Sequence, residues 1–253
     1  MKILSWNVNG IRAAYKKGFA QWLVSAGADI VCVQETKAQA EQFPEGLKNM
    51  PGYLLYTACA KKKGYSGTAV WSRPAAKIID KDRGMKSLDN EGRLVCLRFQ
   101  EFDLLNVYFP NGSASRQRLF YKLDFYKRFL EFAVKLKKKR HVIICGDVNT
   151  AHKEIDLARP EENEDTSGFL PVERKWIDDL LSSGFIDTFR MSNNQPGHYS
   201  WWDYKTAARQ RDVGWRIDYF FVSSGLRDKI QDAFIQKHVL GSDHCPVGID
   251  IGL

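Results

Sequence analysis

The stretch of sequence that most constrains the fold runs from Arg140 to His152 and reads R-H-V-I-I-C-G-D-V-N-T-A-H. It begins with a short apolar run, rich in β-branched residues, that is typical of a strand buried on both faces. Asp147 and Asn149 follow this run two residues apart, so in an extended chain their side chains project to the same side. A strand followed by a turn rich in Asx residues would give the same pattern.

Repetition of this pattern favours a functional site over a set of ordinary turns. Apolar runs at 2–9, 28–35 and 102–109 also end in carboxylates, carboxamides or a tyrosine. The run at 213–222 contains an Asp among apolar neighbours, and an ionised Asp there needs a partner. A last strand, expected at 247–251, is preceded by an Asp-His pair. The candidate side chains are Asn7, Asn9, Glu35, Tyr108, Asn111, Asp147, Asn149, Asp218, Asp243 and His244.

Helical periodicity separates several of the predicted strands. Apolar residues recur near helical spacing over 12–26 and over 115–138, and a third helix is expected from Pro171 to Gly184. These helices and strands are compatible with one large α/β unit. For a chain of 253 residues we expect a single domain that spans 1–253.

The charge balance points toward a polyanionic partner. Lys and Arg total 38 against 30 Asp and Glu, which gives a net charge of +8 and an isoelectric point near 9.2. A merely soluble basic protein would have the same balance. No apolar run approaches the roughly 18 residues that span a bilayer, and the first strand-like run has no signal-peptide core, so we expect a cytoplasmic protein without a membrane partner. The five scattered cysteines are expected to be reduced core residues.

Oxygen donors dominate the candidate side chains, and thiolates are absent from them. This donor set fits a hard cation such as Mg²⁺, or Mn²⁺ as a substitute, far better than zinc. Mg²⁺ uses one or two carboxylates together with substrate phosphate, which Glu35 and Asp243 would satisfy. Asp147 is then free to act on water. Phosphodiester hydrolysis needs a neutralised phosphate, an oriented water and a stabilised leaving oxygen, and the candidate residues supply groups for all three.

Basic residues and aromatic rings are interleaved in two loops. Lys61 to Lys63 precede G-Y-S-G at 64–67, and residues 198–204 read H-Y-S-W-W-D-Y. Such loops suit contact with a nucleic-acid backbone, although a basic run is more often a solvated face and a tryptophan is more often core. Cations continue beyond the second loop, at Lys205, Arg209, Arg211 and Arg216.

Taken together, the motifs resemble those of the exonuclease III family of apurinic/apyrimidinic endonucleases, within the deoxyribonuclease-I-like metal-dependent phosphodiesterases. The resemblance covers essentially the whole chain, with the motifs in the family's order. These motifs are W-N-V-N-G at 6–10, Q-E-T-K at 34–37, G-Y-S-G at 64–67, E-G-R at 91–93, Y-F-P-N-G at 108–112, G-D-V-N-T-A-H-K-E-I-D at 146–156, S-G-F-L-P-V-E-R at 167–174, V-G-W-R-I-D-Y at 213–219 and G-S-D-H-C-P at 241–246.

The resemblance implies a four-layered α/β sandwich, with two mixed sheets packed face to face, helices outside and an active site at one edge. By this resemblance Glu35 and Asp243 are metal ligands, with Asn7 close by. Asp147 is the residue that activates water, and Asn149 assists it.

The resemblance also assigns residues to the phosphate. His244 resembles the family's phosphate-binding histidine and is oriented by Asp218, and we expect a hydrogen bond between these two side chains. The alternative is that Asp218 bonds only backbone groups or Arg216. Tyr108 and Asn111 resemble the family's contacts to the phosphate and the leaving group.

The pocket that receives an extruded deoxyribose in this family corresponds to Trp201, Trp215 and Ile217. Two positions depart from the pattern of some family members, which carry Asp where this chain has Asn9 and Asn where it has Thr166. Further substrate contacts correspond to Lys63, Tyr65, Arg93 and Asn163.

Three functional hypotheses compete. The first is a monomeric Mg²⁺-dependent enzyme that cuts duplex DNA 5′ to abasic sites and also acts on 3′ ends, as a 3′–5′ exonuclease or by removing blocking groups. A phospholipid or inositol-phosphate phosphodiesterase would share the site but would not need the basic aromatic loops. A non-catalytic DNA-binding relative would keep the net positive charge but lack some of the candidate site residues, and none of them is missing here.

Overall fold

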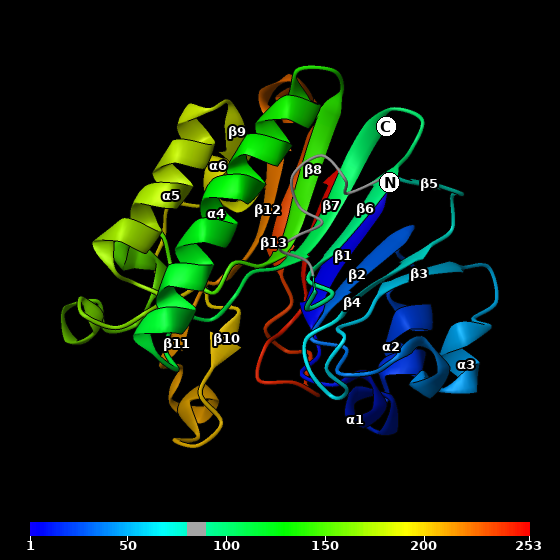
Figure 1. Ribbon diagram of the computed structural model, residues 1–253, viewed down its shortest axis with the longest axis horizontal. Coiled ribbons are helices and arrows are strands. Elements are labelled where there is room, and N and C mark those ends of the chain that lie inside the picture. The colour runs from blue at the N-terminus through cyan, green and yellow to red at the C-terminus, as the bar shows by residue number, and fades with distance from the viewer. Residues whose placement is uncertain (80–89) are drawn as a thin grey trace.

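The computed structural model describes residues 1–79 and 90–253. Two six-stranded sheets lie face to face, and helices cover the outer face of each sheet (Figure 1). Each sheet contains one parallel pair of strands among antiparallel ones, so both sheets are mixed. The fold is a four-layered α/β sandwich, which confirms the predicted fold class.

The first sheet has the strand order β13-β14-β1-β2-β4-β3. Its parallel pair is β1 with β2, and the crossover between them contains two short helices that cover the outer face. The strands are β1 (Lys2–Asn7), β2 (Ile30–Gln34), β3 (Leu54–Ala58), β4 (Thr68–Ser72), β13 (Ile230–Ile235) and β14 (Val247–Ile251), and the helices on this side are α1 (Ile11–Lys16), α2 (Phe19–Ser25) and α3 (Glu45–Lys48).

The second sheet has the strand order β5-β6-β7-β8-β12-β9. Its parallel pair is β7 with β8, joined by the long helix α4, whose first turn is capped by the Ser115 side chain. The strands are β5 (Lys77–Ile78), β6 (Leu94–Arg98), β7 (Phe102–Tyr108), β8 (His141–Asp147), β9 (Phe185–Asp187) and β12 (Asp218–Ser223), and the helices on this side are α4 (Arg116–Lys137), α5 (Pro171–Ser182) and α6 (Thr188–Ser192).

Strand β8 shows why the central strands are apolar on both faces. Val142 and Ile144 pack into the cluster under α4 and α5, whereas Ile143 and Cys145 pack into the cluster between the two sheets. Burial of each such side chain contributes ~1.5–3 kcal/mol. Because this gain is available on both faces, the strand has no polar side chain between exposed His141 at its start and Asp147 at the sheet edge.

The structure corrects two predicted elements. The helix expected at 12–26 is two helices, because Gly18 has a left-handed backbone, with φ of 97°, between α1 and α2. The strand expected at 213–222 is also divided. Its first part pairs in a separate two-stranded ribbon, β10 (Trp201–Trp202) with β11 (Gly214–Trp215), and the chain enters the second sheet only at Asp218.

Short or half-exposed elements have a weaker sequence signal. Strands β3, β9 and β13 were not predicted, because they are short or lie at sheet edges where the apolar pattern is incomplete. The short 3-10 helices are η1 (Ala40–Gln42), η2 (Glu154–Asp156), η3 (Glu161–Asn163), η4 (Ala208–Arg211) and η5 (Ser224–Lys229).

The strand register brings the polar strand ends to one edge of the sandwich. In the second sheet Asp147 lies between Tyr108 of β7 and Asp218 of β12. Strand β1 ends at Asn7 beside β2. None of the helices in the described part of the chain is long and apolar enough to cross a membrane.

Candidate active site

A cavity of about 400 Å³ opens at this edge of the sandwich. It collects side chains from both sheets, from the β10–β11 ribbon and from the loops that follow β7 and β8. Most of the predicted site residues line it. The lining residues are Glu35, Tyr108, Asn111, Ser113, Asp147, Asn149, Thr166, Ser167, Gly168, Trp201, Trp215, Ile217, Asp243 and His244.

Asp147 lies at the floor of this cavity and is almost completely buried. Its Oδ2 accepts hydrogen bonds from the side-chain amides of Asn7 at 2.9 Å and Asn149 at 3.2 Å. The preceding Gly146 has φ of 135°, and a Cβ there would lie 1.9 Å from the Val107 carbonyl oxygen, so only glycine permits this close approach of β7 and β8. Burial raises the pKa of Asp147 to about 7, with Asp218 and Glu35 adding to the effect and His244 opposing it.

Three polar residues of the site have left-handed backbones. The φ angles are 49° at Asn9, 52° at Glu35 and 56° at Asn149. Asparagine tolerates this region, whereas a glutamate rarely adopts it. Because such conformations cost on the order of 1–3 kcal/mol, they persist only where surrounding contacts impose them, and they concentrate at functional sites.

His244 lies between two carboxylates. Its Nδ1 is 2.8 Å from Asp218 Oδ2, so the predicted hydrogen bond is present, and its Nε2 is 3.9 Å from Asp147 Oδ2. Although burial lowers the pKa of His244, the charges of Asp218 and Asp147 outweigh it and raise the pKa to about 10. The imidazole is therefore held as a cation that faces the cavity. Arg216, the alternative partner of Asp218, instead pairs with Asp156 and Asp187.

Substituting Asp218 with Asn should lower the pKa of His244 from about 10 toward its ordinary value near 6.5. The charged imidazole stabilises the folded chain fully below about 6.5, and this contribution is lost as the pH rises through about 10. In the variant this contribution should be smaller, and its loss should be complete at lower pH. Titration of the His244 imidazole by NMR measures the shift directly, and an unchanged pKa would show that Asp218 does not control the charge.

A second group of oxygen atoms suits a divalent cation. Asn7 donates one amide hydrogen bond to Glu35 at 2.9 Å, and Asn9 donates one to Asp243 at 2.9 Å. The Lys37 ammonium lies 2.9 Å from Glu35 and also donates to the Asn9 carboxamide oxygen. Glu35 and Asn9 thus already lie against one positive charge, and all of these oxygens are the hard donors that Mg²⁺ or Mn²⁺ prefers.

Both carboxylates of this group are available as anions. Burial raises the pKa of Glu35, but the charge of Lys37 and the hydrogen bond from Asn7 outweigh this effect and lower it. For Asp243, burial is likewise outweighed by the charge of His244 and the Asn9 hydrogen bond, so its pKa is also lowered. Ionised carboxylates are the form that binds metal.

Asp147, Asp218 and His244 form another cluster, with potential ligand atoms within 4.8 Å of one another. This cluster is less suited to a metal ion than the group that contains Glu35 and Asp243. The reason is geometric, because both ring nitrogens of His244 face carboxylates and Nδ1 is already bonded to Asp218. An imidazole that is protonated on both nitrogens has no lone pair for a metal ion.

Tyr108 lies at the wall of the cavity beside Glu35. Burial, together with the charge of Glu35, raises the pKa of Tyr108 well above its ordinary value, so the phenol stays a neutral hydrogen-bond donor. Arg93 supports it from behind, with its guanidinium 4.6 Å from the ring centroid and a 3.0 Å hydrogen bond to the Tyr108 carbonyl oxygen.

Asn111 and Asn149 form the rim of the cavity. The Asn111 amide donates to Asn149 Oδ1 at 3.0 Å, and the Asn149 amide donates to the Phe109 carbonyl oxygen at 2.9 Å. Asn111 is exposed, so its amide can leave Asn149 and bond a ligand instead.

An apolar wall completes the cavity. Trp201 and Trp215 pair across the β10–β11 ribbon, with ring centroids 6.4 Å apart, and both are only half-buried. They pack against a small cluster that includes Ile217 and Phe169. A tryptophan that served only the core would be more completely buried, as Trp202 is with 1% of its surface exposed.

Four of the predicted substrate contacts lie outside the cavity. Lys63 is exposed, and Tyr65 is half-buried beside it. Arg93 is 1% exposed and bonds Glu91 and Tyr65, so it supports neighbouring side chains and does not face solvent. The Asn163 amide donates to the Arg159 carbonyl oxygen at 2.7 Å within its own loop.

The structure corrects part of the prediction that the cations after residue 204 face a nucleic-acid backbone. Arg216 is buried, so its guanidinium does not face solvent as the interleaved pattern suggested. Arg209 is half-buried, and its guanidinium donates to the carbonyl oxygens of Ser242, Lys237 and Val239. Lys205 and Arg211 are exposed.

Sequence reasoning missed Ser200 and Lys37. The Ser200 hydroxyl donates to Asp218 at 2.7 Å and accepts from the Asp218 backbone N–H at 3.1 Å, so it fixes the carboxylate that holds His244. No pattern singles out this serine. Lys37 lies within the quoted Q-E-T-K motif, and its two-residue spacing from Glu35 was the available signal.

This fold and site together fit the class of phosphodiester hydrolases, because the cavity holds a buried carboxylate, an imidazole between two carboxylates and further oxygen donors that suit a cation. Comparison with known proteins agrees. A family model described as the endonuclease/exonuclease/phosphatase family matches residues 4–244. The chain belongs to this family, in the branch of exonuclease III and the AP endonucleases.

Three relatives illustrate this membership. The chain is 43% identical to an exodeoxyribonuclease of Bacillus subtilis over 258 residues, with both chains covered in full. It is 38% identical to the DNA repair nuclease APEX1 of Danio rerio over 250 residues, covering 98% of this chain and 81% of the relative. The solved AP endonuclease of Archaeoglobus fulgidus aligns over 100% of both chains, with a TM-score of 0.88 and 26% identity.

Proposed function

We propose that this chain is a Mg²⁺-dependent DNA repair phosphodiesterase. It hydrolyses the backbone 5′ to abasic sites in duplex DNA, and it also acts on 3′ ends as an exonuclease or by removing blocking groups. One observation carries the proposal: a buried Asp147 with a raised pKa faces cationic His244 in the same cavity that holds Glu35, Asp243 and an apolar wall.

Each side chain has a role in this reaction. Asp147 accepts a proton from the attacking water, and the Asn7 and Asn149 amides fix its orientation. His244 donates to a non-bridging phosphate oxygen and balances the charge that develops there. Tyr108 supplies a second donor.

Glu35 and Asp243, with Asn7 between Glu35 and Asp147, are the residues that hold the cation. When bound, Mg²⁺ neutralises phosphate charge and stabilises the leaving oxygen. Mn²⁺ has the same ligand preferences and is expected to substitute.

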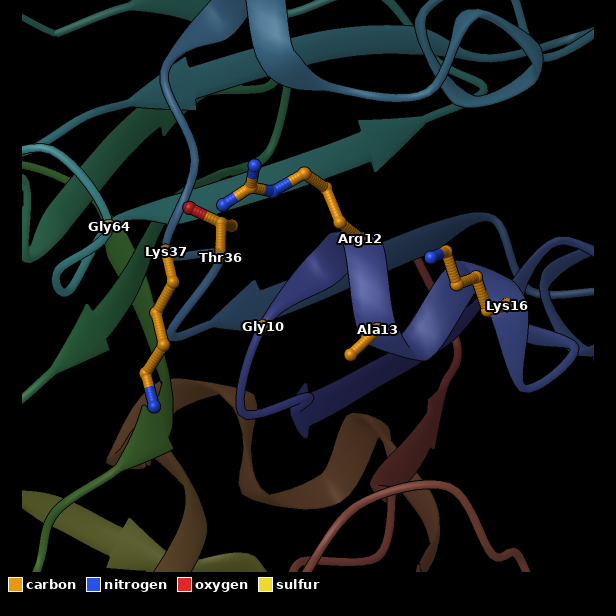
Figure 2. A pocket seen from close by; sticks show the side chains of 7 residues that line it. All are labelled: Gly10, Arg12, Ala13, Lys16, Thr36, Lys37 and Gly64. Atoms are coloured by element: carbon orange, nitrogen blue, oxygen red, sulfur yellow. The ribbon is translucent and has the colours of Figure 1, made fainter.

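A second cavity supports the choice of DNA as substrate. It has a volume of about 510 Å³ and lies against the first helix and the loop after β2, where the side chains of Arg12, Lys16 and Lys37 gather (Figure 2). Figure 2 shows the Arg12 guanidinium directed toward Thr36, whereas the Lys37 side chain extends away from Arg12. The Lys37 ammonium pairs with Glu35. Arg12 and Lys16 at this cavity suit contact with phosphates of a duplex, whereas Lys37 is already paired with Glu35.

The apolar wall explains a preference for abasic nucleotides. Extruding a nucleotide costs a few kcal/mol and costs least where no base is stacked or paired. Trp201, Trp215 and Ile217 then provide a small surface without hydrogen-bond partners for the polar edge of a base. Both filters favour a bare deoxyribose.

The decisive experiment uses a duplex with one abasic site, incubated with the protein with and without EDTA. Incision 5′ to the site that disappears with EDTA supports the proposal. A lipid phosphodiesterase would leave the duplex intact while cleaving inositol phosphates, and a binding-only protein would shift the duplex in a gel without cutting it.

Trp215→Ala tests the selectivity mechanism. We expect incision at the abasic site to fall while relative incision at intact nucleotides rises, with discrimination reduced by about tenfold, or ~1.4 kcal/mol. Competition between abasic and intact duplexes measures the ratio. Trp71→Phe is the matched control, because Trp71 is fully buried in the other half of the molecule and should affect stability alone. Equal losses on both substrates would assign Trp215 to the core.

The proposal extends to the organisation of the protein. We infer a single catalytic domain over 1–253 that acts as a monomer, because one chain supplies every proposed catalytic side chain. A cytoplasmic location, as expected from the sequence, is part of the same proposal.

A further inference from the structure

A buried ion pair lies directly behind the candidate active site. Lys122 of α4 and Glu173 of α5 are 2.6 Å apart, and both side chains are 0% exposed. Neither residue lines the cavity. Two charges without solvent contact are a poor source of stability, because the cost of removing them from water offsets most of their attraction. The remaining hydrogen bonds of the pair therefore indicate what it contributes.

Lys122 holds the loop that follows β8. Its ammonium donates to the Asn149 carbonyl oxygen at 2.8 Å and to the Thr150 hydroxyl at 2.9 Å. Asn149 has a left-handed backbone, and its side chain in turn bonds Asp147. The ammonium thus fixes the carbonyl group of a residue whose amide orients the proposed base.

Glu173 holds the second loop of the cavity. Its Oε1 accepts from the Ser167 hydroxyl at 2.9 Å, and its Oε2 accepts from the Gly168 N–H at 2.6 Å and the Leu170 N–H at 3.2 Å. Gly168 has φ of 105°, and a Cβ there would lie 3.3 Å from the Trp215 ring. The carboxylate therefore sets how closely this loop packs against Trp215.

The two loops are also joined to each other. The Ala151 N–H donates to the Gly168 carbonyl oxygen at 2.8 Å. The ion pair thus closes a ring that runs from α4 through Asn149 and Ala151 to Gly168 and back to α5. The Asn149 side and the Trp215 side of the cavity both depend on this closed set of contacts.

We propose that Lys122 and Glu173 are positioning residues, which set Asn149 against Asp147 and the Gly168 loop against Trp215. The inference rests on the proposed function, because it assigns a task to a pair beneath the proposed base. A pair that served the fold alone would have no reason to contact both cavity loops and would change stability without changing the chemical step.

The principal test is Lys122→Met, which removes the ammonium and keeps a chain of similar length. We expect the single-turnover rate of abasic incision at saturating enzyme to fall about 10- to 100-fold, the scale of a displacement near 1 Å. Affinity for the abasic duplex should change little. Lys122→Arg, which restores a charge and donors, should recover part of the rate. A folded Lys122→Met protein with the wild-type rate would overturn the proposal.

A second variant addresses loss of folding. Lys122→Met alone leaves an unpaired carboxylate buried, so Lys122→Met/Glu173→Gln removes both charges while keeping a carbonyl acceptor for Gly168. This double variant should fold and still show the lower rate, and a wild-type rate in it would overturn the proposal. Asp103→Asn is the matched control. Asp103 is fully buried and pairs with Arg98 at the opposite end of β7, so its loss should reduce stability and leave the rate unchanged.

Hydrogen exchange separates this inference from the proposed function. In Lys122→Met the backbone amide of Ala151 should exchange faster by about tenfold or more, while amides at the centre of β8 stay protected. If the wild-type protein did not incise an abasic duplex, the proposed function would be wrong and the positioning role would be judged on exchange alone. Unchanged protection of Ala151 would then count against it.

Discussion

Asp147→Asn should reduce the rate of abasic incision by about 10²-fold or more, the usual scale for a positioned acid–base group. Asn has nearly the same shape and still accepts a hydrogen bond from Asn7, so the cavity keeps its geometry. It cannot accept a proton from water. The expected loss is therefore in the single-turnover rate, and binding of the abasic duplex should be retained.

Asp147→Asn should also remain stable. The difference in stability between this variant and the wild type should depend on pH in a definite direction. The folded-state pKa of Asp147 is about 7 against an ordinary 3.8, so its ionised form destabilises the native state. In metal-free buffer the stability of Asp147→Asn relative to wild type should be greatest above pH 7. This advantage should shrink as the pH falls through about 7 toward 4, because wild-type Asp147 then becomes protonated.

Denaturant unfolding at several pH values checks this expectation, with Asp103→Asn as control. Asp103 is an equally buried carboxylate, but it bonds Arg98 and Arg140, so its loss should lower stability and spare catalysis. Near wild-type turnover by Asp147→Asn would exclude Asp147 as the group that activates water.

Glu35→Ala is expected to remove most activity at low Mg²⁺ concentration. Loss of even an outer partner of a metal ligand costs about 10- to 100-fold in metal affinity or activity, and loss of a ligand itself should cost at least the upper end of that range. Because Asp243 and the substrate phosphate remain, higher Mg²⁺ concentrations should restore part of the rate by mass action.

A Mg²⁺ titration of the incision rate in both proteins provides the measurement. The concentration at half-maximal rate should increase markedly in Glu35→Ala. Glu45→Ala serves as the control, since Glu45 is an exposed residue of α3 that pairs with Lys48. An unchanged Mg²⁺ dependence in Glu35→Ala would mean that the metal is held elsewhere, for example by the Asp147–Asp218–His244 cluster.

The central strands and the long helix were predictable because their signal is local. β8 alternates apolar side chains into two separate clusters, and α4 has a regular apolar stripe, so the pattern of neighbouring residues is sufficient. The division of the 12–26 helix at Gly18 was visible only in part, since an isolated glycine is tolerated within a helix. The division of the 213–222 strand had no local signal, because Gly214 and Trp215 pair with β10 and not with the strands that flank β12.

For the candidate site, too, local features were predictable and tertiary ones were not. The kinds of side chain at the strand ends indicated a hard cation and hydrolytic chemistry, and their motifs indicated the family. They did not reveal which charged groups face solvent. Arg93 and Arg216 read as substrate contacts in the sequence, yet Arg93 is buried against Glu91, two residues away, and Arg216 is buried against Asp156 and Asp187 of other segments.

The sequence by itself determined the strands, the polar residues at their ends and the likeness to exonuclease III, because each depends on residues close together in the chain. The resemblance also led to the predicted hydrogen bond between Asp218 and His244. Only the tertiary structure decided that Asp147 lies 3.9 Å from the other ring nitrogen of His244, and that Lys122 meets Glu173 beneath the cavity. These pairs join residues from different strands, helices and loops, and their charges depend on burial. Burial and electrostatic pairing arise when distant segments pack, so no local pattern encodes them.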